Sequence, residues 1–301
     1  MRTSVISEPQ ELSDPAFFSR LENVELRAQS IVEGFLHGLH RSPYVGYSVE
    51  FASHHEYVQG DDPRHINWKL YARQHRLYVK EFDGDTNLNL YILFDISSSM
   101  ACASLGRSKL DYAAALAGSL AHLAIRQHDA AGIILFAGQV LASLPPRAKS
   151  HHLQEILGVI ASATPQAQTD TSRAIHQAAA MCRKRGLVAV ISDCFDDLPR
   201  LLDGLDHLLF LNHEVVLFQV LDPWERDLPL EGNIRFRDLE TGETLTTVSE
   251  GVREGYRAAI QDWLAELNAA CLSRGIDRVE LTTNDPLDRA LLDYFMRRSR
   301  H

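Results

Sequence analysis

The feature that most constrains the fold is the apolar run over residues 88–94, which only Asn89 interrupts and which stops abruptly at Asp95. A strand that is covered on both faces has this composition, because neither face tolerates much polar surface. In open α/β sheets, ligands bind in the crevice beyond the carboxyl ends of such strands. The run therefore predicts a buried strand whose final acid lies at a ligand-binding edge.

Three oxygen-bearing side chains follow at a spacing of two residues: Asp95, Ser97 and Ser99. An extended backbone directs alternate side chains to one side, so we expect these three to converge. A carboxylate and two hydroxyls are hard donors that suit Mg²⁺ or Mn²⁺, and neutral hydroxyls would hold such an ion weakly. The alternative is that Asp95 caps the turn while both serines contact solvent. This short motif alone does not decide between the two interpretations.

Composition excludes several classes of protein. The 301 residues, 45% of them hydrophobic, suffice for one large domain or for one domain plus a smaller region. Thirty Lys and Arg against 40 Asp and Glu leave a net charge of −10, which argues against nucleic-acid binding. No apolar run approaches the roughly 20 residues of a membrane span, and residues 1–14 lack the apolar core of a secretion signal. The four cysteines are scattered, so we expect reduced thiols and a cytoplasmic location.

Strand and helix patterns alternate from residue 88 onward, which predicts an α/β fold with a doubly wound, mostly parallel, Rossmann-like sheet. Before it we expect a flexible tail over 1–19 and an extension of a helix and short strands over 20–87. The sheet domain itself is expected over 88–301, with a hairpin inserted near 228–249. The predicted strands cover 88–94, 131–136, 187–191, 215–221 and 278–281, and a further strand, 139–144, is expected to end at two prolines.

A second acid, Asp193, follows the predicted strand 187–191. Strand ends become neighbours where the winding of such a sheet reverses, so Asp193 is expected to lie near Asp95. Thr169 precedes the helix that leads into this strand and can reach the same crevice. Asp95, Ser97, Ser99, Thr169 and Asp193 would then offer oxygen ligands to one octahedral ion.

The order and spacing of these five residues resemble the metal-ion-dependent adhesion site of von Willebrand factor A domains, and the resemblance covers about residue 88 to the C-terminus. It implies that the hydroxyls of Ser97, Ser99 and Thr169 contact Mg²⁺ directly, while Asp95 and Asp193 act mostly through bound water. It also implies a sixth position for a carboxylate on a partner protein. Two features depart from the family pattern. The family often has Gly before the threonine, where this chain has Gln168, and often has Thr-Asp-Gly at the last acid, where this chain has Ser192-Asp193-Cys194.

An upstream segment adds a second motif. Considered by its residues alone, it is a turn locked by ion pairs and by tryptophan packing or, as a second choice, a partner-binding surface. The segment is similar to one bacterial subgroup of A-domain proteins, the uncharacterised domain of unknown function fifty-eight, whose members are typically encoded beside MoxR-type AAA+ ATPases. The motif residues are Gly60, Asp61, Asp62, Arg64, Trp68 and Arg73.

The leading hypothesis is a non-enzymatic, metal-dependent protein-interaction module. By resemblance, its partners would be a MoxR-type AAA+ ATPase and a client protein that offers an acidic residue. One alternative is a metal-dependent phosphohydrolase with Asp95 as nucleophile, although position 97 then lacks the acid that would protonate a leaving group. The other alternative is a scaffold whose metal site is vestigial.

Overall fold

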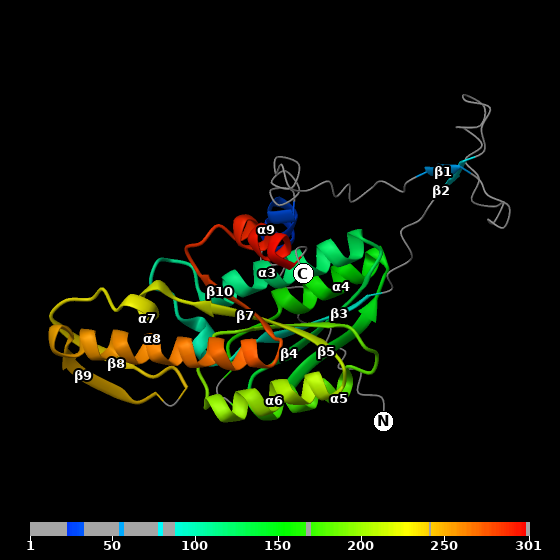
Figure 1. Cartoon of the computed structure of the whole chain (residues 1–301). Helices are drawn as coiled ribbons and strands as arrows, with labels where there is room; N and C mark the ends of the chain where they lie inside the picture. Colours follow the sequence, from blue (N-terminus) through cyan, green and yellow to red (C-terminus); the bar gives the residue numbers. More distant parts are fainter. Residues whose placement is uncertain are drawn as a thin grey trace. The chain divides into compact units, whose positions relative to one another are not determined.

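The computed structural model describes residues 23–32, 54–56, 78–80, 88–166, 170–240 and 242–298 (Figure 1). The chain divides into two compact units, one of Ser42–Asn87 and the other of Met1–Arg41 with Leu88–His301. In the smaller unit, β1 (His54–Glu56) pairs antiparallel with β2 (Tyr78–Lys80). The predicted tail over 1–19 lies outside the described residues. So do the motif residues of the smaller unit, which are Gly60, Asp61, Asp62, Arg64, Trp68 and Arg73.

The larger unit is built on a six-stranded sheet in the order β10-β7-β6-β3-β4-β5. Every neighbouring pair is parallel except β4 and β5, which confirms the predicted doubly wound, mostly parallel α/β fold. The chain begins the sheet at β3, moves outward to β5, and returns to β6 on the other side of β3. The winding therefore reverses between β3 and β6. The strands are β3 (Asn89–Asp95), β4 (Ala130–Phe136), β5 (Val140–Arg147), β6 (Leu187–Ser192), β7 (Glu214–Leu221) and β10 (Asp277–Thr282).

Helices cover both faces of this sheet (Figure 1). On one face lie α3 (Lys109–Arg126), α4 (Ser150–Ala161) and α9 (Leu287–Arg298). On the other lie α5 (Thr171–Met181), α6 (Leu198–Phe210) and α8 (Ser249–Ser273). Between β7 and α8 the chain forms α7 (Pro223–Asp227) and the predicted hairpin, in which β8 (Asn233–Arg237) pairs antiparallel with β9 (Thr244–Val248).

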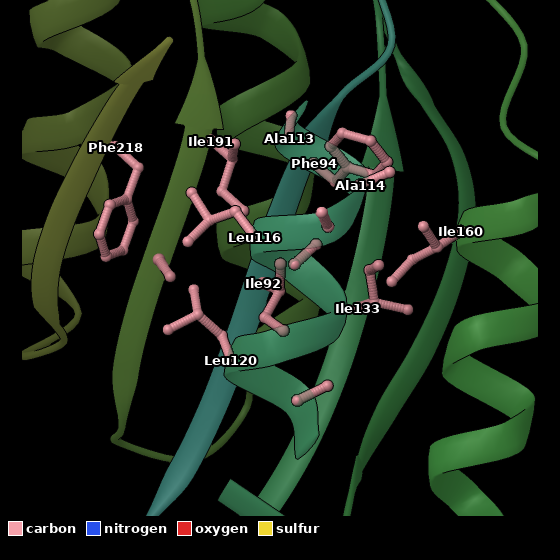
Figure 2. Packing of buried hydrophobic residues seen from close by; sticks show 14 of the residues in the cluster. Ile92, Phe94, Ala113, Ala114, Leu116, Leu120, Ile133, Ile160, Ile191 and Phe218 are labelled. Carbon is pink, nitrogen blue, oxygen red and sulfur yellow. The ribbon is translucent and has the colours of Figure 1, made fainter. Parts of the chain in front are cut away.

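The central strand β3 is buried on both sides, which accounts for its nearly continuous apolar sequence. Ile92 and Phe94 enter the core under α3 and α4, whereas Leu93 enters the core under α5 and α6. Small side chains such as Ala113 allow α3 to lie close over the strand (Figure 2). This packing fixes the position of the strand end that carries Asp95.

The helical segment 23–32 belongs to the larger unit. Ala28 and Val32 are both buried, and a methyl group added to Gly118 of α3 would lie 3.3 Å from the Ala28 Cβ. The amide of Gln154 in α4 also donates to Glu25 at 2.7 Å. The described part of the predicted extension 20–87 is thus divided, because segment 23–32 packs with the sheet whereas β1 and β2 form the smaller unit.

The strand β5 continues through Pro145 and Pro146 to Arg147, so the expected strand end at the two prolines is wrong. The strand lies at the edge of the sheet, where a missing proline N–H costs no ladder hydrogen bond. Pairing with β4 is irregular near Gly132, where an added methyl group would come within 2.6 Å of the Leu144 carbonyl oxygen. Glycine therefore permits the close approach of this proline-containing strand.

Another glycine gives a test of how closely β3 and β6 pack at their N-terminal ends, the edge of the sheet opposite Asp95. A methyl group on Gly186, just before β6, would come within 2.1 Å of the Asn89 carbonyl oxygen in β3. We expect Gly186→Ala to lower the free energy of unfolding, measured by urea denaturation, by about 1–3 kcal/mol, because the paired backbones must separate. The matched control is Gly158→Ala in α4, where the added methyl meets nothing within 4 Å. This control should be stabilised by about 0.5–1 kcal/mol, and an unchanged Gly186→Ala variant would contradict the close contact.

Candidate functional site

The two acids predicted to meet lie at the same edge of the sheet. Asp95 is the last residue of β3, and Asp193 directly follows the adjacent parallel strand β6. Their exposed fractions are only 2% and 3%. The hydroxyl of Ser192 donates to Asp95 Oδ2 at 2.5 Å and so ties the two strand ends together. Both acids therefore flank the point where the winding reverses, which is where doubly wound sheets bind ligands.

The chain bends sharply after Asp95 and brings two hydroxyls together. The Ser97 N–H donates to Asp95 Oδ1 at 2.9 Å, and the short helix η3 (Ser98–Ala101) follows. The hydroxyls of Ser97 and Ser99 then share a hydrogen bond, with their Oγ atoms 3.0 Å apart. Because Mg²⁺ holds octahedral ligands at about 2.0–2.1 Å, two adjacent ligands lie about 3 Å apart. The spacing of the two hydroxyls thus fits one edge of such an octahedron.

Thr169 and Gln168 lie outside the described residues, so the role of Thr169 stays a prediction. The chain before them does approach the bend, because the Gln166 N–H donates to the Ile96 carbonyl at 2.8 Å. Gln166 also forms an isolated parallel bridge with Ser97. After the gap, Asp170 caps α5 by accepting a hydrogen bond from the Arg173 N–H.

A buried lysine that the sequence analysis missed stands at this site. Lys109, the first residue of α3, is fully buried, and its ammonium donates to Asp193 Oδ2 and to Glu225 Oε1, each at 2.7 Å. Ser108 directly before it caps the helix by accepting from the Asp111 N–H. A cation at a helix N-terminus opposes the helix dipole. Its place directly after a capping serine is the one sequence signal that could have marked Lys109.

The buried charges at this edge do not cancel. Burial lowers the pKa of Lys109, but attraction from Asp193 and Glu225 outweighs burial and raises it, so the ammonium stays charged. Burial and repulsion from Asp193 raise the pKa of Asp95 to about 7, against the lowering effect of hydrogen bonds from Ser192 and Ser97. The single ammonium of Lys109 therefore binds two carboxylates, those of Asp193 and Glu225. The negative charge of this pair exceeds the positive charge of the ammonium, so a further cation nearby is electrostatically favourable.

A carboxylate from a distant part of the chain also reaches the bend. The Ser99 N–H donates to Glu240 Oε1 at 2.9 Å, although the two residues are 141 positions apart in sequence. Glu240 lies in the turn between β8 and β9, where the hairpin was predicted but no role for its tip. The bend between Asp95 and η3 thus already accepts an acidic side chain.

The residues present fit a weakly held divalent cation. Ser97 and Ser99 offer correctly spaced hydroxyls, while Asp95 and Asp193 supply negative charge nearby. Within the described ranges, no three His, Cys, Asp or Glu side chains gather in a metal-binding group. Hydroxyl oxygens would therefore have to complete any cation site at this edge, which is chemistry that hard cations accept.

Comparison with known families identifies the chain. A family profile described as "Protein of unknown function DUF58" matches residues 53–265, which is well over half of the sequence. The chain belongs to this family. The match confirms the resemblance seen in the upstream motif, and it extends from that motif through β3 to α8.

Relatives of this DUF58 protein include an uncharacterized protein of Mycobacterium tuberculosis, which is 28% identical over 236 residues, 77% of this chain and 74% of the relative. An uncharacterized Mycobacterium avium protein is 29% identical over 151 residues, 48% of this chain and 86% of the relative.

Among solved structures, conserved hypothetical protein BatB from Bacteroides thetaiotaomicron matches with a TM-score of 0.44 and 21% identity, over 71% of this chain and 100% of that chain. An aerotolerance-related membrane protein from Bacteroides fragilis matches with a TM-score of 0.45 and 20% identity, over 70% and 99%. In the described part of this chain, no helix combines the length and apolar character needed to cross a membrane.

Proposed function

We propose that this DUF58 protein is a non-enzymatic protein-interaction module that binds an acidic side chain of its partner through a divalent cation. The observation that carries the proposal is the Ser97–Ser99 hydroxyl pair, 3.0 Å apart, at the switch point of the sheet between two buried acids. This pair offers the spacing of adjacent Mg²⁺ ligands beside uncompensated negative charge.

Each residue has a stated part in the proposed site. Ser97 and Ser99 would hold Mg²⁺ or Mn²⁺ through their hydroxyls, and the family resemblance adds Thr169. Asp95 and Asp193 would act through bound water, since their oxygens already accept hydrogen bonds from Ser192, Lys109 and backbone amides. The cation would supply a positive charge that attracts a carboxylate from a partner.

The overall charge of the protein supports a bridging cation. With a net charge of −10, the chain repels an acidic partner surface at long range. A cation held by neutral hydroxyls keeps most of its charge and can join two acidic partners. By family resemblance, the partners are a MoxR-type AAA+ ATPase and a client with an acidic residue, in the cytoplasm where ATP is available.

Metal binding and partner capture test the proposal together. We expect Ser99→Ala to weaken Mn²⁺ binding, followed by electron paramagnetic resonance, by about tenfold or more, because one direct ligand is lost. Asp95→Ala should abolish Mg²⁺-dependent pull-down of the MoxR-type ATPase that the family resemblance implies as partner. Ser273→Ala, an exposed serine at the end of α8, is the matched control and should change neither measurement.

Two results would contradict this function. Wild-type protein that binds neither Mg²⁺ nor Mn²⁺ at millimolar concentration would favour the scaffold with a vestigial site. Turnover of a phosphoester by the wild type, lost in Asp95→Asn, would instead establish the phosphohydrolase. Because Ser99 is only partly buried, Ser99→Ala should fold normally and separates loss of metal from loss of structure.

A further inference from the structure

We propose that Glu240 is an internal ligand of the site: its carboxylate occupies, within the chain, the position that a partner's acidic side chain takes. This inference rests on the proposed function and adds its regulation. The contact that carries it is the hydrogen bond from the Ser99 N–H to Glu240 Oε1, 2.9 Å long. Ser99 is also one of the two residues whose hydroxyls form the candidate metal edge.

The hairpin tip is shaped to present this carboxylate. The Glu240 N–H donates to Asp238 Oδ1 at 2.8 Å, and the Gly242 N–H donates to the Asp238 carbonyl at 2.9 Å. Gly242 has a φ of 76°, a left-handed conformation that glycine adopts without strain. The turn therefore holds Glu240 in a defined conformation before it meets η3, which lowers the entropy lost on contact.

The base of the hairpin is anchored to α8, and α8 in turn binds α7, which carries Glu225. The Ser249 N–H donates to the Gly232 carbonyl at 2.9 Å, and the Arg253 guanidinium donates to the Leu230 carbonyl. The Tyr256 hydroxyl donates to the backbone carbonyl of Glu225, whose side chain binds Lys109. The hairpin is thus held at its base by α8, while its tip contacts the site at Ser99.

The contact at the hairpin tip is a polar hydrogen bond between Ser99 and Glu240, in which a carboxylate from a partner can replace that of Glu240. On the hairpin strands, Leu245 is 65% exposed and Val248 52% exposed, so no hydrophobic core holds these side chains in place. Glu240 adds a carboxylate to an edge of the sheet where Asp193 and Glu225 already outnumber the one ammonium of Lys109. This approach is unfavourable without a further cation and favourable with one.

A tethered carboxylate competes with any partner. Its effective concentration is on the order of millimolar, so a partner must displace it and binds with an affinity reduced by the occupied fraction. Removing Glu240 should therefore open the site to acids in solution. Propionate, which reproduces the end of a glutamate side chain, is the probe.

Hydrogen–deuterium exchange of the full chain provides the test. We expect Glu240→Ala to speed exchange of residues 97–101 about tenfold, as loss of one hydrogen bond to a charged group predicts. Propionate with Mg²⁺ should restore protection in this variant and leave the wild type unchanged, whereas the neutral isostere propionamide should restore nothing. The control, Glu231→Ala, removes the same charge from an exposed position before β8 and should exchange like the wild type.

The outcomes separate this inference from the function on which it rests. Wild-type exchange of residues 97–101 in Glu240→Ala, with Mn²⁺ binding intact, would overturn the internal ligand and leave the metal-dependent module standing. Protection restored by propionate equally well in EDTA would support Glu240 as occupant and overturn the metal in the proposed function. Absence of any propionate effect in a loosened Glu240→Ala variant would also overturn the internal ligand.

Discussion

Replacement of Lys109 by methionine is expected to lower the free energy of unfolding by about 3–5 kcal/mol, because it leaves the buried Asp193 and the partly buried Glu225 without their cation. The ammonium of Lys109 is fully buried and binds Asp193 and Glu225 at 2.7 Å each. Methionine keeps most of the side-chain volume, so the loss measures charge rather than packing. Urea denaturation followed by circular dichroism gives the value.

Two further variants establish the cause. Lys184→Met removes an exposed lysine before β6 and should change the unfolding free energy by less than about 0.5 kcal/mol. The double variant Lys109→Met with Asp193→Asn should recover part of the loss, since one unpaired acid is removed with its partner. A loss below about 1 kcal/mol in Lys109→Met alone would show that the ammonium does not compensate these acids.

Truncation of Phe94 to alanine is expected to cost about 3–5 kcal/mol of unfolding free energy, because it leaves a cavity beneath α3. Phe94 is fully buried in the core beneath α3 (Figure 2). In sequence it directly precedes Asp95, the last residue of β3. The cavity should also loosen the strand end, so hydrogen exchange around Ser97 should increase. The exposed Phe210, 82% accessible at the end of α6, is the matched control.

Phe210→Ala should change the unfolding free energy by no more than about 0.5 kcal/mol. Equal losses in the two phenylalanine variants would mean that the core beneath α3 adapts to the missing ring. Loss of stability without faster exchange at Ser97 would mean that the site is held by its own hydrogen bonds. The bonds in question are those from Ser192 and Ser97 to Asp95.

The doubly wound sheet was predictable because its signals are local. The apolar run before Asp95 matches β3, and alternating strand and helix patterns yield the parallel order. The meeting of Asp95 and Asp193 also follows, since parallel strands present their carboxyl ends at one edge. The two prolines of β5 misled the prediction, because prolines in such a run indicate either an edge strand or the end of a strand, and the local sequence does not decide between the two.

The candidate site itself was predictable only in part. Ser97 and Ser99 come together by local geometry, as their spacing indicates. Lys109 binds Asp193, which is 84 residues away in sequence, and Glu225, which is 116 residues away. No periodic sequence pattern predicts these two ion pairs. For Glu240, the sequence indicated only a place in the turn of a hairpin and no functional role.

The amino-acid sequence alone thus establishes the sheet, its switch point and the acids and hydroxyls gathered there, because each follows from short-range patterns and strand direction. Only the tertiary structure decides which charge balances these acids and which carboxylate approaches them. Lys109 is placed by the packing of α3, and Glu240 by the anchoring of the β8–β9 hairpin on α8. Contacts of this kind depend on how distant segments fold together, and no local sequence rule specifies them.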